Sequence, residues 1–249
     1  MIVKAIKTER VRAGSQPLTE LLNKSIDRLS ERSIVVITSK VVSLCENRVV
    51  PIGSMDKEEL IKQEADYYLP ATISSYGYHF TFTHNTLISS SGIDESNGDD
   101  NYVLWPKKPQ VSANKIRKYL KDRFQLTELG VMITDSSCLP ARYGTLVIPI
   151  SHSGFLAIND YRGQPDLFGR PFEVSQAAVA GGLAAAAGVV MGEGTEQTPI
   201  AVIEDLPFVQ FQDRDPTKEE LEKYYIPPFK DDLFSPFLNS QKWQKGGKK

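Results

Sequence analysis

The chain has 249 residues, of which 41% are hydrophobic and 24% are charged, proportions close to those of ordinary globular proteins. This composition excludes a disordered, collagen-like or membrane-embedded chain, and the length suffices for one large domain or two closely associated ones. The 29 basic and 31 acidic side chains give a formal net charge of -2, so no overall field attracts nucleic acid or an anionic membrane. An anionic ligand must therefore be held by local groups.

Cysteine usage and the N-terminal segment lead us to expect a cytoplasmic protein. Cys45 and Cys138 lie far apart and outside any CxxC spacing, which argues against a disulfide scaffold and against a thiolate zinc site. The opening segment MIVKAIKTERVRAG has no apolar core of the length that a signal peptide needs. The run over 177–191 is rich in Ala and Gly and is shorter than the ~20 strongly apolar residues that span a bilayer, so it predicts a buried helix.

Hydrophobic periodicity predicts the first elements. Apolar residues recur at helical spacing between residues 17 and 33 and predict an amphipathic helix, namely Leu18, Leu21, Leu22, Ile26 and Leu29. The β-branched run IVVIT at 34–38 predicts a buried strand, which leads directly into Ser39 and Lys40. Polar groups at the end of a strand are well placed to meet a ligand.

The middle of the chain mixes helical and strand patterns. Helices are expected over 57–69 and 111–124, and the alternation between them predicts strand up to about residue 90, followed by the loop SSSGIDESNGDD. Strands are expected over 129–134 and 145–151, separated by the turn-rich segment DSSCLPARYG.

The last third predicts a small-residue helix over 174–191, a strand over 198–206 and a short helix over the segment TKEELEKYY. The order of elements lacks strict βαβ alternation, which favours an α+β fold of mixed, largely antiparallel sheets with packed helices over a Rossmann fold. We expect one domain over 1–206, followed by a polar C-terminal extension over 207–249 with a mobile, lysine-rich end of ten residues.

The segment from Gly92 to Asn97 contains the first candidate site residues. It places the Asp94 carboxylate and the Asn97 amide in a glycine-flanked loop after a strand. Such a loop can direct Asp94 at a divalent cation and leave Asn97 to hydrogen-bond a base or sugar. The same residue types are the commonest turn formers, so an ordinary Asx turn is the alternative.

A second candidate group follows the strand over 129–134. Asp135 next to the Ser136 hydroxyl at a strand end is a typical way to hold magnesium or manganese near phosphates, and Arg142 would neutralise phosphate oxygens. A helix cap or a surface salt bridge accounts for the same residues.

The third candidate is the glycine-bearing loop that begins after Met191. Backbone N–H groups at Gly192, Gly194 and Thr195 would bind phosphate, and Glu193 would reach a metal ion. The loop is not a Walker A motif, because GK[ST] is absent from the chain, and a plain connection is the alternative.

The three histidines exclude two other classes of site. His79, His84 and His152 show neither HExxH nor HxH spacing, which argues against a histidine-built zinc centre. The GxSxG nucleophile elbow of a Ser-His hydrolase is also absent.

Taken in order, several blocks resemble the coenzyme F420-0:L-glutamate ligase family, the gamma-glutamyl ligases that extend a deazaflavin cofactor precursor. The blocks are IVVITSKVVSLCENRVV at 34–50, SGIDESN at 91–97, GVMITDSSCLPARYGT at 130–145, INDYRGQPDLFGRPFEVSQAAVAGGLAAAAGVVMGEG at 158–194 and TPIAVIEDL at 198–206. No single block is diagnostic, and the resemblance depends on their number and order over roughly residues 5–206.

The resemblance implies a subunit of two intimately associated subdomains that forms a homodimer. It also implies that GTP and two divalent cations, Mg²⁺ or Mn²⁺, bind in a groove. Asp94 and Asp135 match the family's metal-binding aspartates, and Asn97 matches its nucleotide-contacting asparagine. Ser136 stands where the family usually has a metal-binding threonine, and Glu193 where a glutamine-type ligand is expected.

Two stretches near the N-terminus match nucleotide-contacting segments of the family, namely Thr8, Glu9, Arg10 and Val11, and the pair Ser39 and Lys40. Two departures stand out. Leu44 occupies the place of a common family lysine, so that phosphate contact is either missing or supplied by Lys40. The segment DSSCLPAR replaces a DTFGRPWR-like block.

The implied reaction joins L-glutamate to an acceptor carboxylate such as that of coenzyme F420-0. Because amide formation from a carboxylate is uphill in water, the acceptor would first become an acyl phosphate, with Arg142 or Lys40 stabilising the charge on the transferred phosphoryl group. A related amide ligase with a folate-like or peptidyl acceptor is one alternative, and a nucleotide-binding protein without turnover is another.

Overall fold

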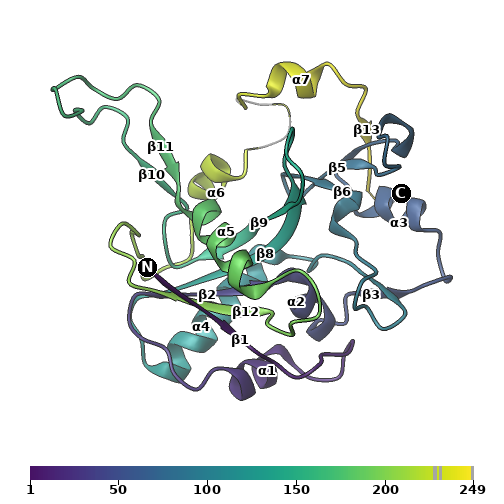
Figure 1. Ribbon diagram of the computed structural model, residues 1–249, viewed down its shortest axis with the longest axis horizontal. Coiled ribbons are helices and arrows are strands. Elements are labelled where there is room, and N and C mark those ends of the chain that lie inside the picture. The colour runs from purple at the N-terminus through teal and green to yellow at the C-terminus, as the bar shows by residue number, and fades with distance from the viewer. Residues whose placement is uncertain (227–228, 230–231, 248–249) are drawn as a thin grey trace.

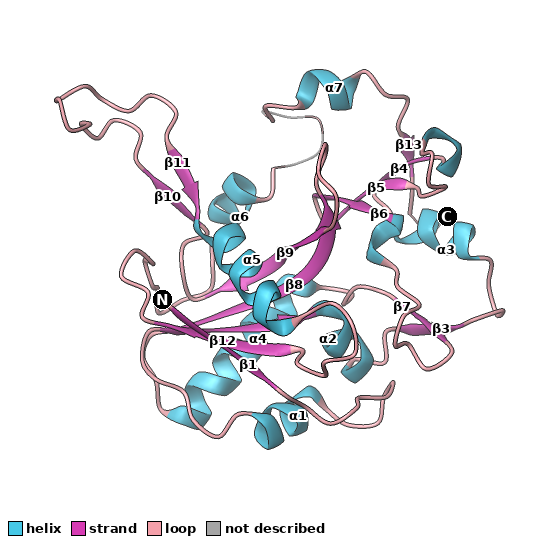
Figure 2. Ribbon diagram, viewed as in Figure 1, coloured by secondary structure: helices cyan, strands magenta, loops and turns pink. Residues whose placement is uncertain are grey.

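A five-stranded sheet forms the centre of the molecule in the computed structural model, which describes residues 1–226, 229 and 232–247 (Figures 1 and 2). In spatial order the strands are β1 (Ile2–Ile6), β12 (Ile200–Glu204), β2 (Ser33–Thr38), β8 (Leu129–Cys138) and β9 (Thr145–Ser153). Strands β2 and β8 run parallel, whereas the other neighbours are antiparallel. The α+β class with mixed, largely antiparallel sheets is confirmed.

Helices cover both faces of this sheet. Val35 and Ile37 of β2 face a core built with α1 (Leu18–Ser25), α2 (Ser39–Cys45) and α4 (Pro109–Phe124). Ile34 and Val36 face a second core built with α5 (Val179–Met191), whose alanines allow close packing on the sheet. Since both faces are buried, the strand reads as the continuous apolar run IVVIT instead of alternating with polar residues.

A smaller unit lies beside the main sheet, on the right in Figure 1. It contains a four-stranded sheet in the order β13 (Gln244–Lys245), β4 (Tyr67–Leu69), β5 (Phe80–Thr83) and β6 (Thr86–Ser89). Helix α3 (Lys57–Glu64) and the paired strands β3 (Val49–Pro51) and β7 (Asn101–Val103) complete it. Buried residues form a separate core here, namely Leu60, Ile61, Ile93, Tyr102 and Leu104.

The remaining elements lie outside these two sheets. Strands β10 (Ile158–Asp160) and β11 (Gln176–Ala178) pair at the base of an arm that projects from the body (Figure 1). Helices α6 (Lys218–Tyr224) and α7 (Ser235–Asn239) and two 3₁₀ turns, Ala71–Ile73 and Ser90–Gly92, complete the described secondary structure. Within the described ranges, no helix has the length and apolar character needed to cross a membrane.

Two predicted helices are shorter in the structure. The helix expected over 57–69 ends at Glu64, because Tyr67–Leu69 pairs with β5 as strand β4. Aromatic side chains fit a pleated, half-buried surface, and here cross-strand pairing outweighs the helical pattern. The helix expected over 174–191 begins at Val179, since Gln176–Ala178 pairs with β10.

The predicted turn over DSSCLPARYG is also shorter. Strand β8 continues past Thr134 to Cys138, and Asp135 pairs with Ile148 of β9. Polar residues are allowed at the end of an antiparallel pair because one side of the hairpin faces water. The connection between the strands is therefore confined to residues 139–144.

The C-terminal extension packs on the main body through Arg117 of α4. Arg117 is 5% exposed, and its guanidinium donates to the carbonyls of Leu129 and Gln212, each at 3.1 Å. It also forms ion pairs with Asp213 at 3.2 Å and Asp215 at 3.4 Å. A buried guanidinium needs such partners to compensate for its lost hydration.

The expected mobile end of ten residues includes β13, which pairs with β4, while residues 248–249 lie outside the described ranges. The division of the chain at residue 206 stays a prediction.

Candidate active site

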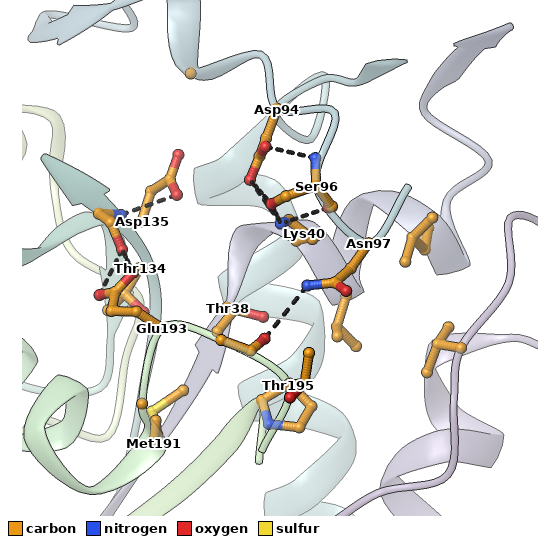
Figure 3. A pocket seen from close by; sticks show the side chains of 18 of the residues that line it. Thr38, Lys40, Asp94, Ser96, Asn97, Thr134, Asp135, Met191, Glu193 and Thr195 are labelled. Carbon is orange, nitrogen blue, oxygen red and sulfur yellow. Dashed lines mark hydrogen bonds and ion pairs between the residues drawn. The ribbon is translucent and has the colours of Figure 1, made fainter. Parts of the chain in front are cut away.

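The three predicted loops meet around one cavity of about 650 Å³. The loop after Gly92, the end of β8 and the loop after α5 contribute side chains to its wall, together with residues 8–12 and the start of α2. In Figure 3, Asp94, Ser96 and Lys40 gather on one side, whereas Asp135 and Glu193 approach from other elements. Segments that are distant in sequence thus form a single site.

Asp135 reaches the cavity from β8 just after an irregularity in the sheet. The register between β8 and β9 shifts between Ile133 and Thr134, opposite Pro149. Proline has no N–H to donate, so it is tolerated within a sheet at such bulges, which also redirect neighbouring side chains.

The Asp135 carboxylate is held by two donors. The Trp105 indole N–H donates to Oδ2, and the Ser136 amide donates to Oδ1 at 2.9 Å. Burial raises the pKa of Asp135 to about 6, because desolvation outweighs these hydrogen bonds, and the nearby Asp94 charge acts in the same direction. The site therefore contains an anion that would gain from a nearby cation.

Asp94 is paired with Lys40. The Lys40 ammonium lies 2.6 Å from Oδ2 of Asp94, 2.8 Å from the Ser96 carbonyl and 3.0 Å from the Ser96 hydroxyl. Burial raises the pKa of the Asp94 carboxyl, but hydrogen bonds from Lys40 and Ser96 more than cancel this effect and hold the pKa below its ordinary value. Three oxygen atoms thus already surround one cationic group.

Hydrogen bonds tie the loop after α5 to the other two segments. The Ser136 hydroxyl contacts both carboxylate oxygens of Glu193, at 2.8 and 2.7 Å. The Asn97 amide donates to the Gly194 carbonyl at 3.3 Å. The Gly194 amide, one of the predicted phosphate donors, binds the Glu196 carboxylate at 2.8 Å. A carboxylate oxygen therefore accepts a hydrogen bond from an amide that is predicted to bind phosphate.

Most other predicted residues also line the cavity, including Thr8, Glu9, Arg10, Val11, Gly192 and Thr195. Thr8 joins the loop after α5, because its amide donates to the Gln197 carbonyl at 2.9 Å. These residues are therefore brought together as expected, and their individual roles stay predictions.

Two predicted residues lie elsewhere. Ser39 is 4% exposed and does not line the cavity, because in the first turn of α2 its side chain is buried while Lys40 faces the cavity. Arg142 is exposed in the connection from β8 to β9 and donates to the Ala141 carbonyl. Since β8 continues to Cys138, and each strand residue advances about 3.3 Å, the chain carries Arg142 away from Asp135. Arg142 does not line the cavity, so this placement lends no support to its predicted catalytic role.

The cavity wall carries more acid than base. Among the described residues its basic side chains are Arg10, Arg12, Lys40 and Lys57, and its acidic side chains are Glu9, Asp94, Asp99, Asp135, Glu193 and Glu196. Several of these basic groups are also paired locally, since Arg12 lies 3.6 Å from Asp99 and Lys57 is paired with Glu95. A polyanionic ligand would therefore meet net repulsion unless cations entered with it.

The donor set fits Mg²⁺ or Mn²⁺. The candidate ligands are the carboxylate oxygens of Asp94, Asp135 and Glu193 and the hydroxyl oxygen of Ser136, the ligand types that these cations prefer. Over the part of the chain that is described, no three His, Cys, Asp or Glu side chains form one metal cluster. Mg²⁺ is usually held by one or two carboxylates together with phosphate oxygens, so a complete protein cage is not required.

Sequence reasoning missed Trp105, which follows β7 and holds Asp135. A tryptophan in an apolar run such as VLWP is typical of a core residue. Only the fold places its indole N–H against a carboxylate that is 30 residues away in sequence. Arg12 and Lys57 were also missed, because only the fold brings them to the cavity wall.

Comparison with known proteins gives a consistent result. Residues 5–205 match the family model described as F420-0:Gamma-glutamyl ligase. The chain is 31% identical over 202 residues to a coenzyme F420:L-glutamate ligase of Methanocaldococcus jannaschii, covering 78% of this chain and 77% of the relative. Proteins of the same name from Methanococcus maripaludis strain C6 and Methanopyrus kandleri are 33% and 28% identical, and in each case the match covers 90% of the relative. The matched share of this chain is 87% and 90%, respectively.

We predict that replacing Lys40 with methionine raises the pKa of Asp94 in the metal-free protein. The substitution removes the ammonium that lowers this pKa and leaves the opposing effect of burial. Carboxyl ¹³C NMR titration measures the shift directly. The matched control is Lys57→Met, which removes another cavity-lining ammonium that is paired with Glu95 instead. An Asp94 pKa that is unchanged in Lys40→Met would contradict this electrostatic account.

Proposed function

Because this chain belongs to the F420-0:gamma-glutamyl ligase family, we propose that it joins L-glutamate to the carboxylate of coenzyme F420-0 and consumes GTP. The chain is a ligase that forms a C–N bond. The observation that carries the proposal is the convergence of Asp94, Asp135 and Glu193 on one acidic cavity within the matched region.

A nucleoside triphosphate supplies the driving force that amide formation lacks. Transfer of the γ-phosphoryl group to an acceptor carboxylate oxygen breaks the bond to the β-phosphate and gives an acyl phosphate. Attack by the glutamate amine then forms the C–N bond, inorganic phosphate leaves, and the amine loses a proton. This route needs no protein nucleophile, so the side chains act by binding and by electrostatics.

Asp94, Asp135, Ser136 and Glu193 would hold the divalent cations. When bound, these ions screen the phosphate charge and polarise the phosphoryl oxygens. The excess of acidic groups on the cavity wall supports this assignment, since a triphosphate needs counter-charge there.

Lys40 would neutralise phosphate charge beside Asp94. Its ammonium already contacts three oxygen atoms, so it could exchange the Asp94 carboxylate for phosphate when that carboxylate binds a cation. The amides of Gly192, Gly194 and Thr195 would orient the nucleotide, and Asn97 would contact its base or sugar. The Gly194 amide is suited to this role because it already binds a carboxylate oxygen.

We also propose that the enzyme is a homodimer. The projecting arm between β10 and β11 exposes Leu167 and Phe168 at 98% and 91%, and Val189 of α5 is 85% exposed. Exposed apolar side chains of this kind are typical of protein–protein contacts. Light scattering at micromolar concentration should give twice the 27.8 kDa of one chain, whereas the mass of a single chain would contradict the dimer.

The function is tested by incubating the protein with coenzyme F420-0, L-glutamate, GTP and Mg²⁺ or Mn²⁺. Mass spectrometry should detect a product extended by a glutamyl residue, and phosphate release should require both glutamate and acceptor. Parallel reactions with ATP and with a folate-like acceptor measure the selectivity for nucleotide and acceptor. Absence of any amide product under all these conditions would contradict the proposal.

Asp135→Asn should lower turnover by roughly two orders of magnitude or more, because a cation ligand contributes several kcal/mol to the transition state. Its control is Arg142→Ala, which should retain turnover because Arg142 lies outside the cavity.

The same variant gives an independent readout of stability. Folding raises the pKa of Asp135 to about 6. The contribution of this carboxyl to folding stability is therefore complete below about pH 4 and is lost as the pH rises through about 6. In metal-free protein above pH 6, Asp135→Asn should therefore melt at the same or a higher temperature than the wild type. Lower stability with preserved turnover would assign Asp135 a purely structural role.

A further inference from the structure

Trp105 contacts both carboxylate-bearing segments of the cavity. Its indole N–H donates to Oδ2 of Asp135, as described above. The five-membered ring of the indole also packs directly on Gly92, two residues before Asp94. A single side chain thus touches one aspartate and the loop that carries the other.

The contact with Gly92 leaves no room for a side chain. A Cβ atom built on Gly92 would lie 2.2 Å from the indole nitrogen and 2.4 Å from Cε2 of Trp105. Gly92 also has φ of +68°, in the left-handed region that favours glycine. The close approach of this loop to the indole ring therefore requires glycine on two grounds.

The position of the ring is itself fixed. Trp105 is 4% exposed and belongs to the core beneath the main sheet. Its carbonyl accepts a hydrogen bond from the Arg48 side chain at 3.2 Å, and the preceding Leu104 amide donates to the Arg48 carbonyl at 3.1 Å. A side chain anchored in this way can hold a carboxylate in one orientation.

We propose that Trp105 is a positioning residue that orients Asp135 for cation binding and, by packing on Gly92, keeps the Asp94 loop at a fixed place opposite it. The inference rests on the proposed function, because it concerns the same cation site. Hydrogen-bond donors to a metal-binding carboxylate commonly change metal affinity by roughly 10- to 100-fold when they are removed.

The first test measures Mn²⁺ affinity by electron paramagnetic resonance in the absence of turnover. Trp105→Phe removes the N–H and keeps an aromatic ring, and it should raise the Mn²⁺ dissociation constant roughly 10- to 100-fold. The control is Trp243→Phe, which removes the chain's other tryptophan, whose indole N–H donates to the Leu238 carbonyl. This control should bind Mn²⁺ as the wild type does.

A second test examines the packing on Gly92. Gly92→Ala should weaken Mn²⁺ binding when Trp105 is present. The loss of Mn²⁺ affinity should be smaller in the Trp105→Phe background, because the five-membered indole ring that the new Cβ would meet is absent there. Gly163→Ala is the matched control, since Gly163 has φ of +79° and no atom within 4 Å of a built Cβ. It introduces similar backbone strain without the contact, and should leave Mn²⁺ affinity unchanged.

A third measurement uses unaltered protein and so does not depend on the folding of Trp105→Phe. The two tryptophans give two indole signals in ¹⁵N-labelled protein, and Trp243→Phe identifies which belongs to Trp105. Mg²⁺ should shift the Trp105 signal and Mn²⁺ should broaden it, with a smaller effect on Trp243.

The outcomes separate this inference from the proposed function. If the wild type binds neither cation, either alone or with GTP present, the metal-dependent function is overturned and the role of Trp105 falls with it. If the wild type binds Mn²⁺ and Trp105→Phe binds it equally well, the role of Trp105 alone is overturned. A Trp105 indole signal that does not respond to bound Mg²⁺ would also overturn that role.

Discussion

The desolvation of the half-buried Asp135 carboxylate at the end of a core strand is the constraint on which the site depends. Strand β8 is held in the central sheet by its parallel pairing with β2, so the position of Asp135 is set by the hydrophobic core. Desolvation of its charge is costly, and the Trp105 indole and the Ser136 amide offset only part of that cost. The fold thus provides an anion that favours a cation beside it.

The same constraint links the two hydrophobic units of the chain. Trp105 follows a strand of the smaller unit but packs in the core of the main sheet, where it also meets the loop that carries Asp94. The Asn97 contact with Gly194 and the Ser136 contact with Glu193 then close the third loop over the cavity. Side chains from both units therefore line one cavity, so a shift of one unit relative to the other would change its geometry.

The sequence predicted the buried elements well, because burial leaves a strong pattern. The run IVVIT and the apolar spacing of α4 identify elements whose place in the core is confirmed. Asp94, Asp135 and Glu193 were predicted from carboxylates at the ends of strands and in a glycine-bearing loop, and all three line the cavity. Arg142 lies outside the cavity wall because β8 extends to Cys138, and the length of β8 depends on pairing with β9. Trp105 was missed because its N–H partner is set by tertiary structure. Local patterns contain neither kind of information.

Transfer of oxygen from the acceptor to phosphate tests the central claim most directly. Coenzyme F420-0 whose acceptor carboxylate carries ¹⁸O is incubated with the enzyme, L-glutamate, GTP and Mg²⁺, and the released phosphate is analysed by mass spectrometry. If the carboxylate is activated as an acyl phosphate, each phosphate released with the amide product retains one oxygen from that carboxylate. Amide product accompanied by phosphate without ¹⁸O would contradict this account of the reaction.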